Sequence, residues 1–244
     1  MNLKPLLQNF TRFLGYDIKK YDASALGYSL QDDAKTLISY ICQHNAPVIF
    51  DVGANIGQSA KSFKEWFPQS IIHAFEPSPS TFEQLSHACV SMPNVHLNRL
   101  GVGSNKGSFT FFENELSDIS SFLEPTELLW GRVKDRKPIE IITIDDYVGE
   151  HGVTNIDFLK IDTQGFDFEV VKGCAKLCAR NAVQLIQMEV NFENFYKNLP
   201  QVDEIMRYLF DRNFKLVGFY GFHHKHIAAS WSDMLLIHES QLAK

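Results

Sequence analysis

The chain has 244 residues, of which 45% are hydrophobic and 13% aromatic, and its formal net charge is −6. This composition is typical of a globular protein with an ample core, and it excludes an intrinsically disordered chain. The negative charge argues against a broad basic surface for nucleic acid, so no nucleic-acid partner is expected.

The first 46 residues are expected to form a helical extension, with helices near 3–14 and 31–44. The leading helix is amphipathic and is expected to pack on the main body, with a membrane surface or a partner helix as the alternative. No apolar run approaches the roughly 20 residues that span a bilayer, and no signal peptide is recognised, so no integral membrane segment is expected. The four cysteines have no zinc-site spacing and are expected to be free thiols, which favours a cytoplasmic location.

From residue 47 onward, apolar stretches alternate with helical patterns. Strands are predicted at 48–53, 71–76, 95–103, 156–162, 183–190, 214–220 and 233–239. Helices are predicted near 58–66, 79–90, 167–177 and 201–211.

The apolar runs that begin near residues 48, 71, 156 and 183 are continuous rather than alternating, as in parallel strands buried on both faces. The last two strands are separated by a predicted loop without a helical pattern, which indicates an antiparallel hairpin. The prediction is therefore a doubly wound α/β fold with a mostly parallel seven-stranded sheet that ends in this hairpin. Residues 47–244 would form one domain.

Residues 104–147 interrupt the alternation. Within them, "GSFTFFEN" and "PIEIITIDDYV" are predicted as strands on either side of a long polar loop. This insertion is expected to form a small β structure above the functional edge of the main sheet.

The stretch "VIFDVGANIGQSA" predicts a strand, a tight turn and a helix start, with the order Asp51-x-Gly53-x-Asn55-x-Gly57. Such a turn lets a ligand approach the backbone and the free N–H groups of the helix. The spacing departs from the dinucleotide pattern G-x-G-x-x-G. A carboxylate in the turn would repel a pyrophosphate but could accept hydrogen bonds from an ammonium group, so a ligand with an amine is favoured.

Glu76 follows the second strand, roughly 20 residues after the turn, where an acid can bind both hydroxyls of a ribose. A ribose and an amine together describe S-adenosyl-L-methionine (SAM). An NAD-dependent oxidoreductase and a non-catalytic SAM-binding protein are the alternatives.

Four motifs in order and spacing resemble those of the FkbM-type methyltransferases: "FDVGANIGQSA", "AFEPSPSTFEQL", "TIDDYV" and "IDFLKIDTQGFDFEVVKG". The resemblance implies a class I methyltransferase domain that transfers the SAM methyl group to a hydroxyl of a sugar, a glycan or a small secondary metabolite, leaving S-adenosyl-L-homocysteine. It also implies the cofactor residues. They are Asp51, Gly53, Ala54, Asn55, Gly57, Glu76, Pro77, Ser78, Ser120, Ser121 and Asp162.

Candidate catalytic groups follow the later strands, because a ligand in such a sheet lies beyond the carboxyl ends of its strands. Asp162 is the first candidate for the base, although cofactor binding or helix capping would also explain it. Glu189 and His223 are the other candidates, and an unreactive hairpin loop is the alternative for the histidine. Trp130 and Tyr196 are candidate acceptor contacts.

No metal is expected. The histidines near residue 223 and Asp233 offer enough groups for a metal, but their spacing fits no zinc site. The sequence leaves a homo-oligomer open.

Overall fold

The computed structural model describes residues 29–225 and 227–242 of the 244-residue chain. The helix predicted near residues 3–14 lies outside the described residues. The helix predicted at 31–44 is α2 (Leu30–Ile41), which begins at the N-cap Ser29, whose side chain accepts a hydrogen bond from the backbone N–H of Asp32. No helix among the described residues is long and apolar enough to cross a membrane.

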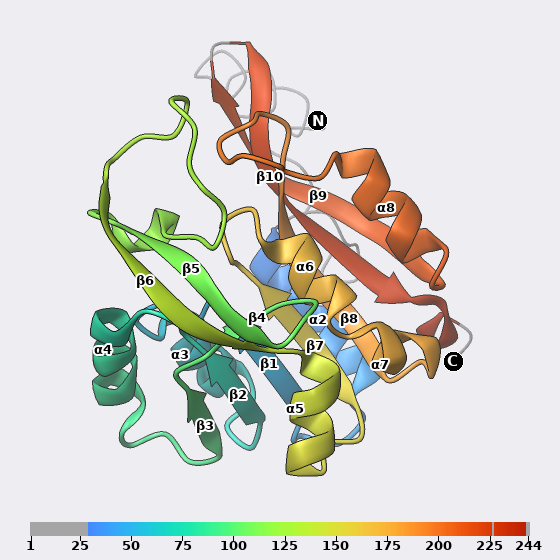
Figure 1. Ribbon diagram of the computed structural model, residues 1–244. Helices are drawn as coiled ribbons and strands as arrows, with labels where there is room; N and C mark the ends of the chain where they lie inside the picture. The colour runs from blue at the N-terminus through green and yellow to red at the C-terminus, as the bar shows by residue number, and fades with distance from the viewer. Residues whose placement is uncertain (1–28, 226, 243–244) are drawn as a thin grey trace, which may run out of the picture.

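The main sheet has seven strands in the order β3-β2-β1-β7-β8-β10-β9 (Figure 1). Every strand is parallel to its neighbours except β10, which lies antiparallel between β8 and β9. The strand order reverses between β1 and β7, which confirms the predicted doubly wound fold. The strands are β1 (Val48–Val52), β2 (Ile71–Phe75), β3 (Val95–Asn98), β7 (Ile156–Ile161), β8 (Val183–Asn191), β9 (Phe214–Lys225) and β10 (Ala228–His238).

Helices cover both faces of this sheet and enclose two apolar clusters (Figure 1). One face carries α2, α3 (Gln58–Trp66) and α4 (Pro79–Cys89). The opposite face carries α5 (Ile144–His151), α6 (Asp167–Lys172), α7 (Ala175–Ala179) and α8 (Val202–Phe210). Burial on both sides explains why the parallel strands are continuously apolar in the sequence.

The predicted insertion forms a second, three-stranded sheet with the order β4-β6-β5. Its strands are β4 (Gly101–Val102), β5 (Gly107–Asn114) and β6 (Val133–Ile142), and a short 3₁₀ helix (Ser117–Ile119) follows β5. The strand predicted at 95–103 is divided between the two sheets, because the chain leaves the main sheet after β3.

The prediction that the strand "PIEIITIDDYV" continues to residue 148 is wrong. The strand β6 ends at Ile142, and Thr143 caps α5 by accepting a hydrogen bond at 3.1 Å from the backbone N–H of Asp146. Two acidic residues in the first helical turn add favourable charge there. The single helix predicted at 167–177 is likewise two short helices, α6 and α7, which meet at Gly173 and Cys174.

The long loop predicted between the last two strands is also wrong, because β9 extends to Lys225 and β10 begins at Ala228. Cross-strand aromatic contacts support this extension. The rings of the paired residues His223 and Trp231 stack with centroids 4.2 Å apart, and Phe222 also stacks on Phe192, in the loop after β8, at 6.0 Å.

Candidate active site

A cavity of about 290 Å³ opens at the carboxyl edge of the main sheet. Its walls come from the ends of β1, β2, β7 and β8, from the start of β10 and from the insertion. The antiparallel direction of β10 explains why its first residues reach the same edge as the ends of its neighbours. The lining includes Gly53, Asn55, Glu76, Pro77, Asp118, Ser120, Trp130, Asp162, Glu189, Asn191, Phe195, Tyr196, Trp231 and Asp233.

The glycine turn brings the β1 backbone against the end of β7. Gly53 has φ +81°, and a Cβ atom built on it would lie 1.9 Å from the carbonyl oxygen of Asp162. The backbone N–H groups of Gly53 and Ala54 both donate to the carbonyl of Phe75, at 3.0 and 2.9 Å. Gly53 is therefore required because any side chain would collide with the β7 backbone.

Glu76 ties the same turn together from the end of β2. Its two carboxylate oxygens accept hydrogen bonds from the backbone N–H groups of Asn55, at 3.0 Å, and Ser78, at 2.9 Å. Burial raises the pKa of Glu76 to about 7, an effect that these two hydrogen bonds oppose and the nearby Asp51 and Asp162 reinforce. The side chain still lines the cavity.

Asp51 takes a different position from the one that the sequence predicts. Its side chain is fully buried and is absent from the described cavity lining. The Lys160 ammonium, on the directly paired residue of β7, lies 3.4 Å from Asp51 Oδ1 and 3.4 Å from Asp162 Oδ2. Burial raises the pKa of Asp51, although Lys160 lowers it in part. Asp51 therefore acts on the cavity through Lys160 rather than by direct contact.

Lys160 is held between these two carboxylates. Burial disfavours its charged form, yet Asp51 and Asp162 raise its pKa overall above the usual lysine value. Asp162 itself has a side chain that is 47% exposed, and it accepts a hydrogen bond at 2.9 Å from Gln164 Nε2. Asp162 thus faces the cavity with a fixed orientation.

The other predicted cofactor residues fall into two groups. Pro77 and Ser120 line the cavity, and Ser120 Oγ accepts a hydrogen bond from the N–H of Asn114. The side chains of Ser78 and Ser121 are buried and hold the insertion in place. Ser78 Oγ donates to Glu113 at 2.8 Å, and Ser121 Oγ donates to the carbonyl of Gln164 at 2.7 Å. Two further residues, Ala54 and Gly57, shape the turn without being part of the described lining.

The candidate bases occupy different environments. Glu189 lines the cavity, and burial, followed by the nearby Asp162, Asp167 and Asp233, raises its pKa well above the usual range. His223 is exposed on the edge strand β9, and it is absent from the described lining. Its ring stacks on that of Trp231. The expected loop position of His223 is therefore wrong, because the strand continues through it.

Sequence reasoning missed one side of the cavity. Trp231 and Asn191 line it, and Asp233, considered above only as a metal ligand, lies beside them. Phe195 and the predicted contact Trp130 complete this side, with Tyr196 close by. The signal available was the alternation "SWSD", in which Trp231 and Asp233 share one face of β10.

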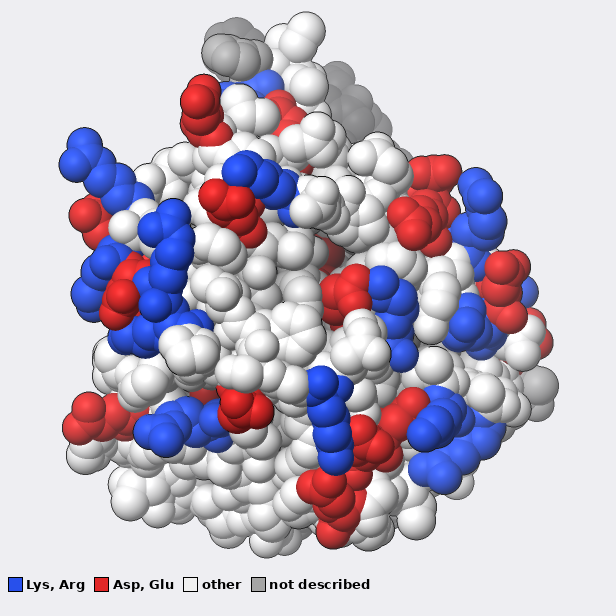
Figure 2. Space-filling view, viewed as in Figure 1, with Lys and Arg blue, Asp and Glu red and all other residues white. Residues whose placement is uncertain are grey.

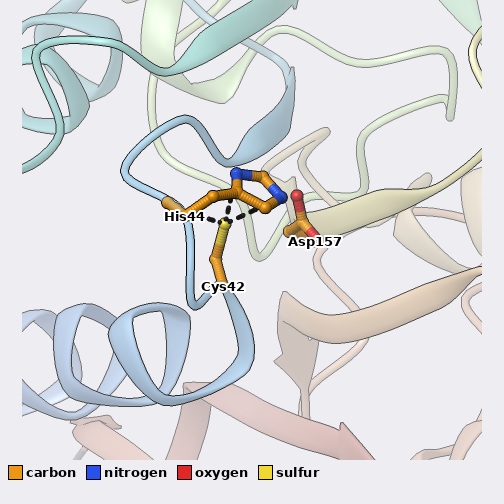
Figure 3. Close-up of side chains that lie close together, drawn as sticks. All are labelled: Cys42, His44 and Asp157. Atoms are coloured by element: carbon orange, nitrogen blue, oxygen red, sulfur yellow. Dashed lines mark hydrogen bonds between the residues drawn. The ribbon is translucent and has the colours of Figure 1, made fainter.

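A group of possible metal ligands lies at the opposite, amino edge of the sheet (Figure 3). Ligand atoms of Cys42, His44 and Asp157 lie within 4.8 Å of one another. The Cys42 thiol donates to the His44 carbonyl at 2.8 Å, and Asp157 Oδ2 accepts from the N–H of Val48 at 2.8 Å. The first bond lies within the segment that follows α2, and the second joins β7 to the start of β1, so the thiol and the carboxylate each have a structural hydrogen bond.

Comparisons with known proteins agree with this architecture. The model of the "Methyltransferase FkbM domain" matches residues 51–216, which is more than half of the chain. The 2-O-methyltransferase NoeI of Sinorhizobium fredii is 26% identical over 138 residues, covering 52% of this chain and 57% of that protein. The hexuronic acid methyltransferase AglP of Haloferax volcanii is 27% identical over 145 residues, covering 59% of this chain and 56% of that protein.

The crystal structure of the methyltransferase FkbM from Methylobacillus flagellatus KT has the same fold, with a TM-score of 0.54 and 14% sequence identity. It aligns with 80% of this chain and 44% of its own. This chain therefore spans little more than half the length of the curated relatives it matches. The match over residues 51–216, carried on the doubly wound sheet, shows that the chain belongs to the FkbM methyltransferase family.

Proposed function

We propose that the chain is a SAM-dependent O-methyltransferase that acts on a hydroxyl of a sugar or glycan. Family membership supports methyl transfer, and the two relatives described above are named for 2-O-methylation and for hexuronic acid methylation. The observation that carries the proposal is the cavity itself, in which the Gly53 turn and the Glu76 carboxylate meet at the switch point of the sheet.

The residues present fit this cofactor. A Cβ atom at Gly53 would close the approach between the turn and β7, whereas glycine leaves the backbone accessible. Glu76 would accept hydrogen bonds from the ribose hydroxyls, while Asn55, Pro77 and Ser120 would border the rest of the nucleoside. Asp162 would face the ammonium group, with Asp51 and Lys160 fixing its orientation from beneath.

The bound cofactor supplies an electrophilic methyl group on a sulfonium. We assign the general base to Glu189, because it lines the cavity beside Trp231 and Phe195, and because burial, which raises its pKa, makes its ionised form a stronger base. Glu189 would accept a hydrogen bond from the acceptor hydroxyl and would take its proton during methyl transfer. Asp162 would then orient the cofactor, and Glu189 replaces it as the first candidate for the base.

The remaining features of the proposal concern the whole protein. We propose that residues 47–244 form the methyltransferase domain, preceded by an extension of residues 1–46, and that the protein acts in the cytoplasm. The free and buried cysteines 42, 89, 174 and 178 support a reducing location. A homo-oligomer is compatible with these features.

Methyl transfer from labelled SAM to a glycan panel tests this function, with SAM affinity measured separately by calorimetry. Glu189→Gln should lower kcat by about 10²- to 10⁴-fold, the contribution typical of a general base, and leave SAM affinity unchanged. Glu204→Gln, an exposed change on α8, is the matched control and should keep full activity. Normal turnover in Glu189→Gln would remove Glu189 as the base, and the absence of SAM binding in the unmodified chain would refute the function.

A further inference from the structure

The side of the cavity farthest from the glycine turn carries two carboxylates in direct opposition. Glu189 on β8 and Asp233 on β10 are cross-strand partners, as are the adjacent Asn191 and Trp231. All four side chains line the cavity. Like charges that face each other across neighbouring strands destabilise a sheet, so this acidic pair has a cost that the fold alone does not explain.

The described surroundings of the acidic pair supply only weak compensation. Asn191 Nδ2 lies 3.3 Å from Glu189 Oε1, and Gln187 Nε2 lies 3.4 Å from Asp233 Oδ1. Neither carboxylate has a salt-bridge partner among the described residues, and the described cavity lining contains five acidic side chains but no lysine, arginine or histidine. Burial, followed by Asp162, raises the pKa of Asp233, and the hydrogen bond from Gln187 with the more distant Lys160 and His223 offsets this only in part. A cation bound on this side of the cavity would therefore stabilise the ionised forms of both carboxylates.

Asp233, the outer member of the acidic pair, lies well away from the glycine turn and from Asp162, beside which the ammonium group of the cofactor is proposed to bind. In the strand order β1-β7-β8-β10, Asp233 is three strands from the glycine turn on β1. Neighbouring strands are about 4.8 Å apart, so the separation is roughly 14 Å. The carboxylate Asp162, at the end of β7, is closer to the turn. The acidic pair thus belongs to the acceptor side of the cavity.

Three aromatic rings stand beside the acidic pair and form one wall. The ring centroids of Trp130 and Trp231 are 5.5 Å apart, those of Trp130 and Phe195 are 5.8 Å apart, and those of Phe195 and Trp231 are 5.9 Å apart. Such a wall can stack on the apolar face of a sugar ring, and it attracts a cation through the negative faces of its rings. Carboxylates and aromatic rings in one subsite together favour an ammonium-bearing ring.

We propose that the acidic pair and the aromatic wall bind an acceptor that carries an ammonium group, of the amino-sugar type, and that they exclude anionic acceptors such as uronates. This inference rests on the proposed methyl transfer and specifies its substrate class. It separates this chain from the relative named for hexuronic acid, because a uronate carboxylate would meet two further carboxylates here. Asp233 holds the ammonium group, while Glu189 remains free to accept the hydroxyl proton.

Glucosamine, glucose and glucuronate form a matched test series, because they share one ring and differ in charge. Their affinities for the full chain are measured by calorimetry, with and without S-adenosyl-L-homocysteine. Glucosamine should bind about tenfold more tightly than glucose, the factor expected for one desolvated cation site, and glucuronate should bind more weakly than both. Asp233→Asn should abolish the advantage of glucosamine, whereas Asp203→Asn, an exposed change on α8, should retain it.

Each outcome decides the proposal. Equal affinity for glucosamine and glucose, stronger binding of glucuronate, no binding of glucosamine, or an unchanged preference in Asp233→Asn would overturn it. The measurements without cofactor test the acceptor subsite independently of the proposed methyl transfer. A preference for glucosamine in a chain that does not bind SAM would support the subsite and refute the proposed function.

Discussion

The buried acidic groups at the two edges of the main sheet differ in their hydrogen bonding. At the amino edge, Asp157 is saturated, since Oδ2 accepts from the N–H of Val48 at 2.8 Å and Oδ1 accepts from Asn155 Nδ2 at 3.1 Å. At the carboxyl edge, neither oxygen of Asp51 and only one oxygen of Asp167 accepts a hydrogen bond from the described residues. The first arrangement stabilises the fold through hydrogen bonds, whereas the second relies on the Lys160 ammonium, 3.4 Å from Asp51 Oδ1, and leaves one oxygen of Asp167 without a hydrogen-bond partner among the described residues.

The face drawn in Figure 2 shows no comparable separation of charge. On the face drawn in Figure 2, basic and acidic side chains are intermixed. The distinction between the edges lies in the buried groups.

The largest effect is expected at the glycine turn. Gly53→Ala should lower the free energy of unfolding by more than about 3 kcal/mol, because φ is +81° and the new Cβ atom would lie 1.9 Å from a backbone oxygen. Gly149→Ala is the control, since it adds a Cβ atom with nothing within 4 Å. This control should raise stability by up to about 1 kcal/mol, since alanine favours a helix more than glycine does. Urea denaturation measures both, and equal stability of the two variants would contradict the close approach of β1 and β7.

The next effect concerns the cation beneath the cavity. Lys160→Met removes the ammonium between Asp51 and Asp162 and should lower stability by about 3 kcal/mol, the scale for breaking a buried ion pair. Lys197→Met removes the partner of Glu124 in an exposed pair and should leave the unfolding midpoint unchanged. If the two variants unfold at the same urea concentration, Lys160 does not hold the carboxyl edge together.

A smaller effect should appear in the pH dependence of stability. The pKa of Glu76 is raised from 4.5 to about 7, so the folded state binds more protons than the unfolded state within this window. Stability should therefore fall as pH rises from about 4.5 to 7, by at most about 3 kcal/mol from this group. Glu76→Gln should remove this part of the slope. An unchanged slope would show that the carboxyl of Glu76 does not resist ionisation.

His73 should give the opposite slope from the interior of the sheet. Burial, with help from His96 and His151, lowers its pKa from 6.5 to about 4, so the unfolded state binds the extra proton between these values. Its contribution to stability is therefore present above about pH 6.5 and is lost as pH falls toward 4. His73→Phe should flatten that part of the profile, and thermal unfolding at several pH values measures it. A profile that keeps its acid limb would contradict a neutral buried His73.

The sequence predicts the features that depend on neighbouring residues better than those that depend on contacts between distant strands. Continuous apolar runs located the parallel strands, and the spacing of Gly53 and Glu76 placed both residues at the cavity. The start of α5 was missed because the apolar run of β6 leads directly into Thr143, whose capping role is local and subtle. The acidic pair was not predicted because it depends on tertiary structure. Glu189 and Asp233 are 44 positions apart and face each other only because β10 inserts between β8 and β9.

Titration of the chain with SAM, with NAD as the rival ligand, tests most directly whether the carboxyl edge is a methyl-donor site. We predict that SAM binds, that NAD does not, and that Glu76→Ala weakens SAM binding by about 1–3 kcal/mol, the scale for losing hydrogen bonds to a charged group. Binding of NAD in place of SAM, or a SAM affinity that Glu76→Ala leaves unchanged, would contradict the account.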